Sequence, residues 1–397
     1  MKKLFAILLT LAMVLSLAAC GGNDSGAPSD SGSGSDSQQG ASQPADDGGS
    51  EGGGSSIRVA MITDYGDITD QSFNQTTYEA SKAWCGANGV DFTYYKPAGD
   101  STAERVAMVE KAADEDYNVI VMPGFAFGET ITQVADTYPE ISFIALDVSE
   151  GDVGGTVPEN VYCAVYKEEL CGYMAGYAAV KLGYKHLGYL GGMAVPAVQR
   201  FGYGYVQGID AAAGELGLSD VVVEYVYGNQ FFGDPDITAY TDNWYQNLGV
   251  EVVFACGGGI CTSAGEAAAK VPGTKVIGVD VDQSFNLDAA YGEGVTLTSA
   301  MKGLAATVNH MLDEVSAGNF ADYAGKAEAL GLVSGDDPDA NYVLLPMETT
   351  QWGDGFSQDD YKALVKDMFD GKITVSDDIS AMPSVSNIKV NDLGNIK

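Results

Sequence analysis

The sequence predicts an α/β fold of two lobes, each built on a parallel sheet covered by helices. Short apolar runs alternate along the chain with helical runs, and such β-α-β-α order implies parallel strands with helices on both faces. Runs such as Val119–Met122 are continuously apolar, as strands buried on both faces should be. Ten such runs exceed one ordinary sheet, so we expect two lobes with a break near Lys167–Tyr184.

The first residues have the features of a bacterial lipoprotein signal. Lys2 and Lys3 precede an apolar run, Leu4–Leu17, which is too short to span a bilayer comfortably. The following Leu17-Ala18-Ala19-Cys20-Gly21 resembles a lipobox, in which the cysteine becomes the lipidated N-terminus after cleavage. We therefore expect a signal peptide over residues 1–19 and a lipid anchor on Cys20. The alternative is an ordinary signal peptide with an incidental cysteine.

A tether is expected after the anchor. Residues 21–56 contain no apolar residue larger than alanine or proline and cannot bury enough surface to fold. Residues 20–56 would thus join the lipid anchor to the folded domain by a flexible Gly/Ser/Asp segment. This arrangement predicts a protein held on the extracytoplasmic face of the cell membrane, and the long tether favours a Gram-positive envelope. No later segment has 18 unbroken apolar residues, so no second membrane span is expected.

Composition limits the partners. The chain has 55 acidic and 20 basic residues and a formal charge of −35, which argues against nucleic-acid binding. A strongly acidic balance fits a soluble extracellular protein that repels its own copies, and a monomer is expected.

Cysteine and histidine contents indicate neither a disulfide framework nor a metal site. Besides Cys20 there are five cysteines, an odd number, at positions 85, 163, 171, 256 and 261. Cys256 and Cys261 flank three glycines and have the spacing to bridge, but we favour free thiols that act as small buried apolar residues. With two histidines, His186 and His310, and no paired cysteine motif, no metal is expected.

The elements follow in regular order. The first lobe is expected over residues 57–166, completed by part of the C-terminal region. The hinge and second lobe follow over 167–300, and a returning helix with crossover segments over 301–397. The predicted strands are Val59–Thr63, Asp91–Tyr95, Val119–Met122, Ser142–Leu146, Val161–Val165, Leu187–Leu190, Val221–Tyr227, Val252–Ala255, Lys275–Val279 and Val295–Ser299. The predicted helices are Gln71–Ala87, Ser101–Asp116, Phe127–Tyr138, Lys167–Leu182, Ala197–Gly217, Ile237–Leu248, Cys261–Val271 and Leu304–Ala317.

Enzyme signatures are not found. The sequence has no GxxxxGK[ST] phosphate loop and no GxSxG elbow, and two histidines leave little room for a catalytic triad. The segment Gly202–Gly208 resembles a dinucleotide fingerprint but carries one residue too many. We interpret its glycines as allowing a helix to pack closely. A binding protein without enzymatic activity or cofactor is therefore expected.

The first two candidate ligand segments follow predicted strands, where ligands bind in open α/β sheets. Asp64, Phe73 and Asn74 bring a carboxylate, an aromatic ring and a carboxamide to the end of the first strand. Phe73 taken alone is equally well explained as a core residue. Phe231 and Phe232 are adjacent in a loop with Gly and Asp, and two such rings are poorly explained as core.

Two further segments lie after later strands. Ala255-Cys256-Gly257-Gly258-Gly259 permits close backbone approach to a ligand, although the segment taken alone is better explained as a plain tight turn. Asp280 ends an apolar strand and Lys302 follows the next one, so the pair is suited to gripping vicinal hydroxyls. A surface ion pair would also explain the lysine.

On these motifs the chain resembles the basic membrane protein family of ABC-transporter substrate-binding lipoproteins, typified by purine nucleoside receptors. The most specific elements are Asp70-Gln71-Ser72-Phe73-Asn74-Gln75, Phe232-Gly233-Asp234-Pro235, Ile277-Gly278-Val279-Asp280-Val281-Asp282-Gln283 and Ser299-Ala300-Met301-Lys302. The resemblance implies a fold like type I periplasmic binding proteins, with two Rossmann-like lobes joined by three crossovers. The chain departs from the pattern at Val281, where serine is commoner, and in the cysteines beside the glycine loop.

The resemblance also implies roles for individual residues. The base would be sandwiched by Phe73 and Phe232, with Phe231 as the alternative stacker, and its edge read by Asp64 and Asn74. The ribose hydroxyls would be held by Asp280, Lys302 and the loop around Gly258.

The expected function is an extracytoplasmic receptor that binds purine nucleosides and delivers them to an ABC permease. Alternatives are a receptor for a sugar or another small polar ligand, or a ligand-sensing surface lipoprotein without a transport role.

Overall fold

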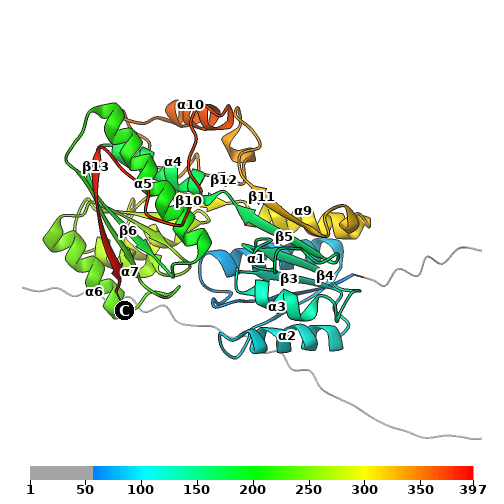
Figure 1. The fold of residues 1–397 in the computed structure, drawn as a ribbon. Coiled ribbons are helices and arrows are strands. Elements are labelled where there is room, and N and C mark those ends of the chain that lie inside the picture. The colour runs from blue at the N-terminus through cyan, green and yellow to red at the C-terminus, as the bar shows by residue number, and fades with distance from the viewer. Residues whose placement is uncertain (1–56, 397) are drawn as a thin grey trace, which may run out of the picture. The chain divides into compact units, whose positions relative to one another are not determined.

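The computed structural model describes residues 57–396 (Figure 1). The expected signal peptide, the lipidated Cys20 and the tether lie outside the described residues. Within the described range no helix has both the length and the apolar character needed to cross a membrane.

The first sheet has six parallel strands in the order β11-β5-β4-β3-β1-β2. Its strands are β1 (Arg58–Ile62), β2 (Asp91–Tyr95), β3 (Val119–Pro123), β4 (Ser142–Leu146), β5 (Val161–Tyr166) and β11 (Lys326–Leu330). The central strand β3 is buried along its whole length, as its continuous apolar sequence predicts.

The second sheet has seven strands in the order β12-β10-β9-β8-β6-β7-β13, all paired in parallel except β12 with β10. Its strands are β6 (His186–Gly191), β7 (Val221–Tyr227), β8 (Val252–Cys256), β9 (Lys275–Asp280), β10 (Thr296–Lys302), β12 (Val343–Leu344) and β13 (Ile388–Asn395). The orders β2-β1-β3-β4-β5 and β7-β6-β8-β9-β10 repeat one topology, which accounts for the similar strand-and-helix pattern of the two halves.

The chain passes between the sheets three times. It leaves the first sheet after β5 through α4 (Glu168–Lys181), returns after β10 through α9 (Leu304–Ala317), and leaves again between β11 and β12. We use "first lobe" and "second lobe" for the first and second sheets with the helices packed on them. Both have the α/β architecture with parallel sheets that the sequence predicts.

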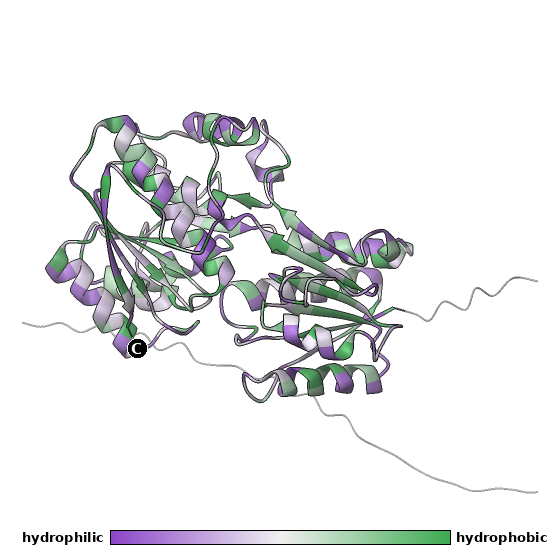
Figure 2. Cartoon of the chain, viewed as in Figure 1, coloured by the Kyte–Doolittle hydropathy of each residue, from purple (hydrophilic) through white to green (hydrophobic). Residues whose placement is uncertain are grey.

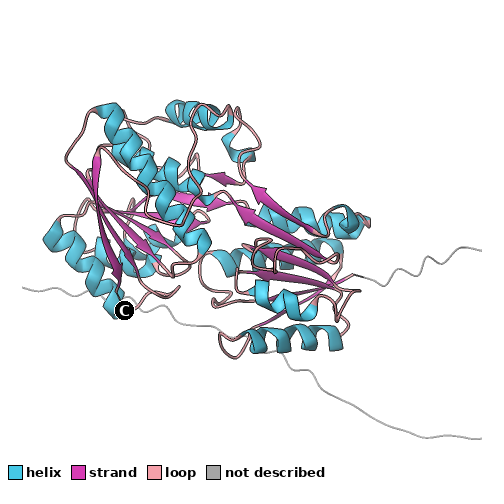
Figure 3. Ribbon diagram, viewed as in Figure 1, coloured by secondary structure: helices cyan, strands magenta, loops and turns pink. Residues whose placement is uncertain are grey.

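Helices cover both sheets, as Figure 3 shows. They are α1 (Phe73–Asn88), α2 (Thr102–Asp114) and α3 (Phe127–Val134) in the first lobe and α5 (Pro196–Leu216), α6 (Pro235–Asn243), α7 (Cys261–Ala268) and α8 (Ser284–Tyr291) in the second, followed by α10 (Gln358–Phe369). Short helical turns lie at Trp244–Leu248, Phe320–Asp322 and Pro338–Ala340. Apolar residues concentrate in the strands, and the helices carry mixed faces (Figure 2).

All ten predicted strands and all eight predicted helices are present, with ends that differ by up to five residues. The sequence did not predict two helices, α8 and α10, or three strands, β11, β12 and β13. The five cysteines within the described residues are free and buried, so the favoured interpretation of free thiols is confirmed.

Helices α4 and α5 pack unusually closely because glycines form the contact. A Cβ at Gly172 of α4 would lie 2.1 Å from the carbonyl oxygen of Phe201, and one at Gly204 of α5 would lie 2.1 Å from that of Glu169. These separations are far below van der Waals contact. The interpretation of the Gly202–Gly208 segment as a packing motif is therefore confirmed.

This contact predicts opposite effects for two glycine-to-alanine substitutions. Gly172→Ala should destabilise the protein by roughly 1–3 kcal/mol, because backbone on the facing helix must move. The control Gly86→Ala lies in α1 with nothing within 4 Å of its Cβ, and should stabilise by about 0.5–1 kcal/mol. Urea denaturation measures both changes, and a loss of equal size in the two variants would contradict the packing argument.

Candidate functional site

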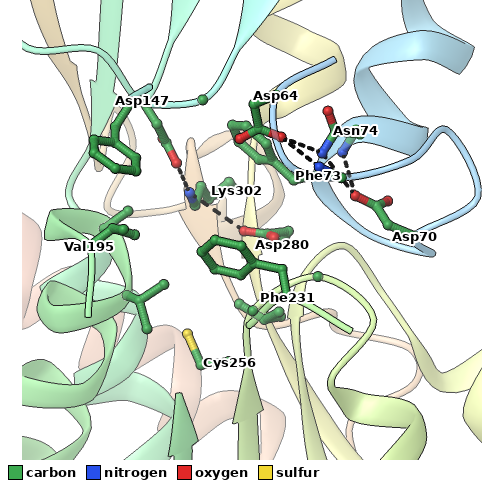
Figure 4. A pocket seen from close by; sticks show the side chains of 18 of the residues that line it. Asp64, Asp70, Phe73, Asn74, Asp147, Val195, Phe231, Cys256, Asp280 and Lys302 are labelled. Carbon is green, nitrogen blue, oxygen red and sulfur yellow. Dashed lines mark hydrogen bonds and ion pairs between the residues drawn. The ribbon is translucent and has the colours of Figure 1, made fainter. Parts of the chain in front are cut away.

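A cavity lies at the carboxyl ends of the strands of both sheets (Figure 4). The space between its protein atoms, part of which is open to solvent, is about 620 Å³. Its lining residues are Asp64, Gly66, Asp70, Phe73, Asn74, Gly124, Phe125, Asp147, Val195, Ala197, Val198, Phe201, Phe231, Cys256, Gly257, Gly258, Val279, Asp280 and Lys302. Six of the seven expected ligand residues are in this set, and Phe232 is not.

One end of the cavity is a network around the Asn74 amide. The Asn74 side-chain nitrogen donates to Asp64 at 3.0 Å and to Asp70 at 3.1 Å, and its oxygen is buried without a hydrogen-bond partner. Asp70 also accepts the backbone N–H groups of Ser72, Asn74 and Gln75, so it caps α1. The free Asn74 oxygen is an acceptor for a ligand N–H or O–H, because buried polar groups are normally paired.

Burial perturbs Asp64 strongly. Removal from water raises the pKa of its carboxyl to about 6, although hydrogen bonds from the Gly66 N–H and the Asn74 amide act in the opposite direction. Gly124 permits this placement, since a Cβ there would lie 2.1 Å from the Asp64 carboxylate. A buried carboxylate of this kind is suited to accepting hydrogen bonds from donors on a ligand.

The raised pKa predicts a pH-dependent stability. The folded-state pKa of about 6 exceeds the ordinary 3.8, so Asp64 stabilises the fold fully below pH 3.8 and loses this contribution as the pH rises through 6. Asp64→Asn removes it. Between pH 7 and pH 5 we therefore expect the unfolding free energy of the wild type to rise relative to that of the variant. Denaturation at several pH values tests this, and parallel profiles would contradict it.

The other end of the cavity is a buried charge cluster around Lys302. The Lys302 ammonium lies 2.7 Å from Asp147, 3.4 Å from Glu168 and 3.5 Å from Asp280. Its side chain is 2% exposed. Burial alone would lower the pKa of Lys302, but the three carboxylates outweigh burial and raise it, so the lysine stays charged. Figure 4 shows the ammonium between Asp147 and Asp280.

Excess carboxylate surrounds this cation. Glu168 is fully buried and is also bound by the Arg200 guanidinium at 2.6 Å. Two cations thus serve three carboxylates, and the Asp147 Oδ1 atom is buried without a hydrogen-bond partner. Burial raises the pKa of Asp147 to about 6, while Lys302 acts to lower it. Unmet acceptors beside a shielded cation favour ligand hydroxyl groups over anions.

Asp147 and Glu168 are absent from the sequence-based expectations. The signal for Asp147 was present, because Ala145-Leu146-Asp147-Val148 ends its strand as Gly278-Val279-Asp280-Val281 ends another. Both aspartates have a positive φ, 58° at Asp147 and 66° at Asp280, an uncommon conformation for residues other than glycine. Glu168 has no such signal, because burial of a glutamate at a helix start depends on its partners.

The two lobes are in direct contact beside the cavity. The Ser72 hydroxyl donates to Asp280 at 2.6 Å, and the Gln283 amide donates to the Gln71 carbonyl at 3.0 Å. Both bonds join a first-lobe residue to one of the second. Asp280 is thus shared among the cavity, Lys302 and the other lobe.

The aromatic residues differ in exposure. Phe73 lines the cavity with the Lys302 ammonium 4.8 Å from its ring centre, a cation–π distance. Phe231 also lines the cavity, whereas the Phe232 side chain is 61% exposed. The positions of the two rings therefore favour Phe231 as the second aromatic of the cavity.

The glycine loop after β8 supports Phe231. Gly258 has φ 51°, and a Cβ there would lie 2.7 Å from the Phe231 carbonyl oxygen. The Gly259 N–H donates to that carbonyl at 2.9 Å. The loop thus packs against the aromatic segment and lines the cavity at the same time.

No set of three or more His, Cys, Asp or Glu side chains suited to a metal ion is found among residues 57–396.

The two lobes have the fold of the type I periplasmic-binding-protein class. Among solved structures, an ABC-transporter solute-binding protein from Aeropyrum pernix has a TM-score of 0.62 and 22% identity, covering 80% of this chain and 87% of that one. Another from Conexibacter woesei has a TM-score of 0.61 and 21% identity, covering 81% of this chain and 99% of that one.

Residues 57–342 match the family described as Bmp, ABC transporter substrate-binding protein PnrA-like. The chain belongs to this family, whose members are substrate-binding proteins of ABC transporters and not enzymes.

Two curated relatives show the range of names in the family. The ABC transporter nucleoside-binding protein BmpA of Lactococcus lactis is 26% identical over 66% of this chain and 76% of its own. The CD4+ T-cell-stimulating antigen of Listeria innocua is 27% identical over 87% of this chain and 95% of its own.

Proposed function

We propose that this protein is the receptor of an ABC importer for purine nucleosides. The observation that carries the proposal is the donor–acceptor balance of the cavity. Four carboxylates, those of Asp64, Asp70, Asp147 and Asp280, line it together with aromatic rings. Of the described residues that line the cavity, Lys302 is the one with a positive charge, and carboxylates already surround it.

Such a site favours a ligand with a flat ring, several hydrogen-bond donors and no negative charge. Aromatic stacking on a base is worth roughly 1–3 kcal/mol. Carboxylates accept strong hydrogen bonds from hydroxyl and N–H groups, and they repel phosphate. A nucleoside satisfies all three conditions. The name of the Lactococcus lactis relative, a nucleoside-binding protein, gives independent support.

Within this proposal the two ends of the cavity have separate tasks. Asp64 and Asn74 read the edge of the base between Phe73 and Phe231, and Asp280, Asp147 and Lys302 hold the ribose hydroxyls with the loop at Gly258. Closure of the two lobes on the ligand would create the shape that the permease recognises. Cys20 would anchor the protein to the outer face of the membrane.

Isothermal titration tests the proposal. The panel comprises adenosine, guanosine, inosine, uridine, adenosine 5′-monophosphate, ribose and amino acids. We expect binding of the purine nucleosides and much weaker binding of the monophosphate. Absence of heat with every nucleoside would refute the proposal, and heat with ribose alone would indicate a sugar receptor.

The ribose contact has its own test. Asp280→Asn should weaken adenosine far more than adenine, because the free base lacks the hydroxyls. Ser72→Ala is the matched control, since it removes the interlobe bond to Asp280 but leaves the carboxylate in place. Equal losses for adenosine and adenine in Asp280→Asn would rule out the ribose role.

A further inference from the structure

A second, outer hollow adjoins the buried cavity. Its space, including open solvent, is about 1450 Å³, and its walls come from both lobes. Tyr65 belongs to its first-lobe wall and Phe232 to its second-lobe wall. Three residues, Gly66, Asp70 and Phe231, line the outer hollow and the buried cavity alike.

Aromatic rings form part of the partition between the two spaces, beside Gly66 and Asp70. Phe125 lines the buried cavity, Tyr65 lines the outer hollow, and Phe231 lines both. The Tyr65 ring centre lies 6.2 Å from that of Phe125 and 6.2 Å from that of Phe231. Side chains of this kind can rotate or shift, whereas a backbone wall would not, so the partition is one that a ligand group can displace.

The partition lies at one end of the cavity only, the end that contains Asp64 and Asn74. Gly66 and Asp70 belong to the end that contains Asp64 and Asn74, since the Asn74 amide bonds to both carboxylates. The ribose end is different, because Asp147, Asp280 and Lys302 line the buried cavity and are absent from the outer hollow. A ligand with its sugar in the charge cluster therefore presents its base edge to the partition.

We propose that the outer hollow is a second subsite, which receives an apolar or aromatic group attached to the base edge of a purine nucleoside. The inference rests on the proposed function and extends its substrate class to base-modified nucleosides. Phe232 lines the outer hollow and is 61% exposed, and such a group would cover part of its ring. Groups attached at the sugar would meet the enclosed charge cluster and be rejected.

Two isomeric probes test this orientation of the ligand. N6-benzyladenosine carries a benzyl group on the base edge, and 5′-O-benzyladenosine carries the same group on the sugar. Against adenosine in isothermal titration, we expect N6-benzyladenosine to bind within about three-fold of adenosine or more tightly, and 5′-O-benzyladenosine to bind at least about 100-fold more weakly.

A variant shows whether the outer hollow binds the benzyl group or only leaves room for it. Phe232→Ala should lower the affinity ratio of N6-benzyladenosine to adenosine by about three- to ten-fold, because it removes the ring that the benzyl group covers. Phe369→Ala, an exposed ring at 47% in α10, is the matched control and should leave the ratio unchanged.

The outcomes are distinguishable. Tight adenosine binding with rejection of N6-benzyladenosine, or preference for the 5′-isomer, overturns the subsite and leaves the proposed function intact. An unchanged ratio in Phe232→Ala also overturns the subsite. Failure of adenosine and all other nucleosides to bind overturns the proposed function, and the subsite with it.

Discussion

Replacing Lys302 with methionine is expected to destabilise the ligand-free protein by roughly 3–5 kcal/mol, because the change leaves buried carboxylates without their cation. Lys302 is 2% exposed and lies within 3.5 Å of Asp147, Glu168 and Asp280. Urea denaturation at pH 7 measures the loss. The loss should shrink as the pH falls from 7 to 5, since removal of Lys302 raises the pKa of Asp147 above its wild-type value of about 6 and protonation then stabilises the variant more than the wild type.

The control for this prediction is a lysine in an exposed pair. Lys270 lies 2.8 Å from Asp242 but is 40% exposed, so Lys270→Met should cost about 0–1 kcal/mol. A double variant, Lys302→Met with Asp147→Asn, should recover part of the stability lost in the single variant. Equal losses in the two lysine variants would mean that the buried carboxylates do not need the cation.

The second large effect is expected on ligand binding. Under the proposed function, Phe231→Ala should weaken adenosine by roughly 5- to 150-fold, the value of one stacking contact. Adenine should lose affinity to a similar degree, because the ring stacks on the base alone. The neighbouring Phe232→Ala should have little effect on adenosine, since that ring does not line the cavity and is 61% exposed. Titration calorimetry measures both variants.

A larger loss in Phe232→Ala than in Phe231→Ala would restore the expectation from the sequence. It would also mean that the loop carrying both rings rearranges when the ligand binds. Circular dichroism of the two variants checks that each is folded before the comparison is made.

Most of the fold was predictable because buried segments have an apolar composition that can be recognised in the sequence. Strands such as β3 and β8 are buried on both faces and are apolar throughout. The strands that were not predicted lie at sheet edges, where this apolar signal is weak. β11 reads Lys-Ala-Glu-Ala-Leu and β13 carries Asn, Asp and Gly, so neither has an apolar run, and the alternation of polar and apolar residues extends over only four residues in each. These segments are strands because they form backbone hydrogen bonds with β5 and β7, and their composition alone does not indicate this.

Helix α10 is a different case, because its signal was in the sequence. Ser357 and Asp360 form a capping box, and Tyr361, Leu364, Val365 and Met368 make an apolar face at helical spacing. Helix α8 has eight residues and no side-chain cap, so local sequence provides little evidence for it.

The sequence by itself determined the type of fold and the position of the cavity. Asp64, Asn74, Asp280 and Lys302 follow or end apolar strands, and the carboxyl ends of parallel strands meet at one edge. This rule is local to each strand, so it can be applied without knowledge of tertiary contacts.

Only the tertiary structure decided which groups face one another. Lys302 meets Asp147 and Glu168 across more than 130 residues of chain, and the lobes must come together for this to happen. The choice between Phe231 and Phe232 is also tertiary. Phe232 pairs with Gly259 in a short β-bridge, and neighbouring side chains of an extended segment point to opposite sides. The glycines packed against Phe231 determine that the cavity lies on the side of the segment to which Phe231 points.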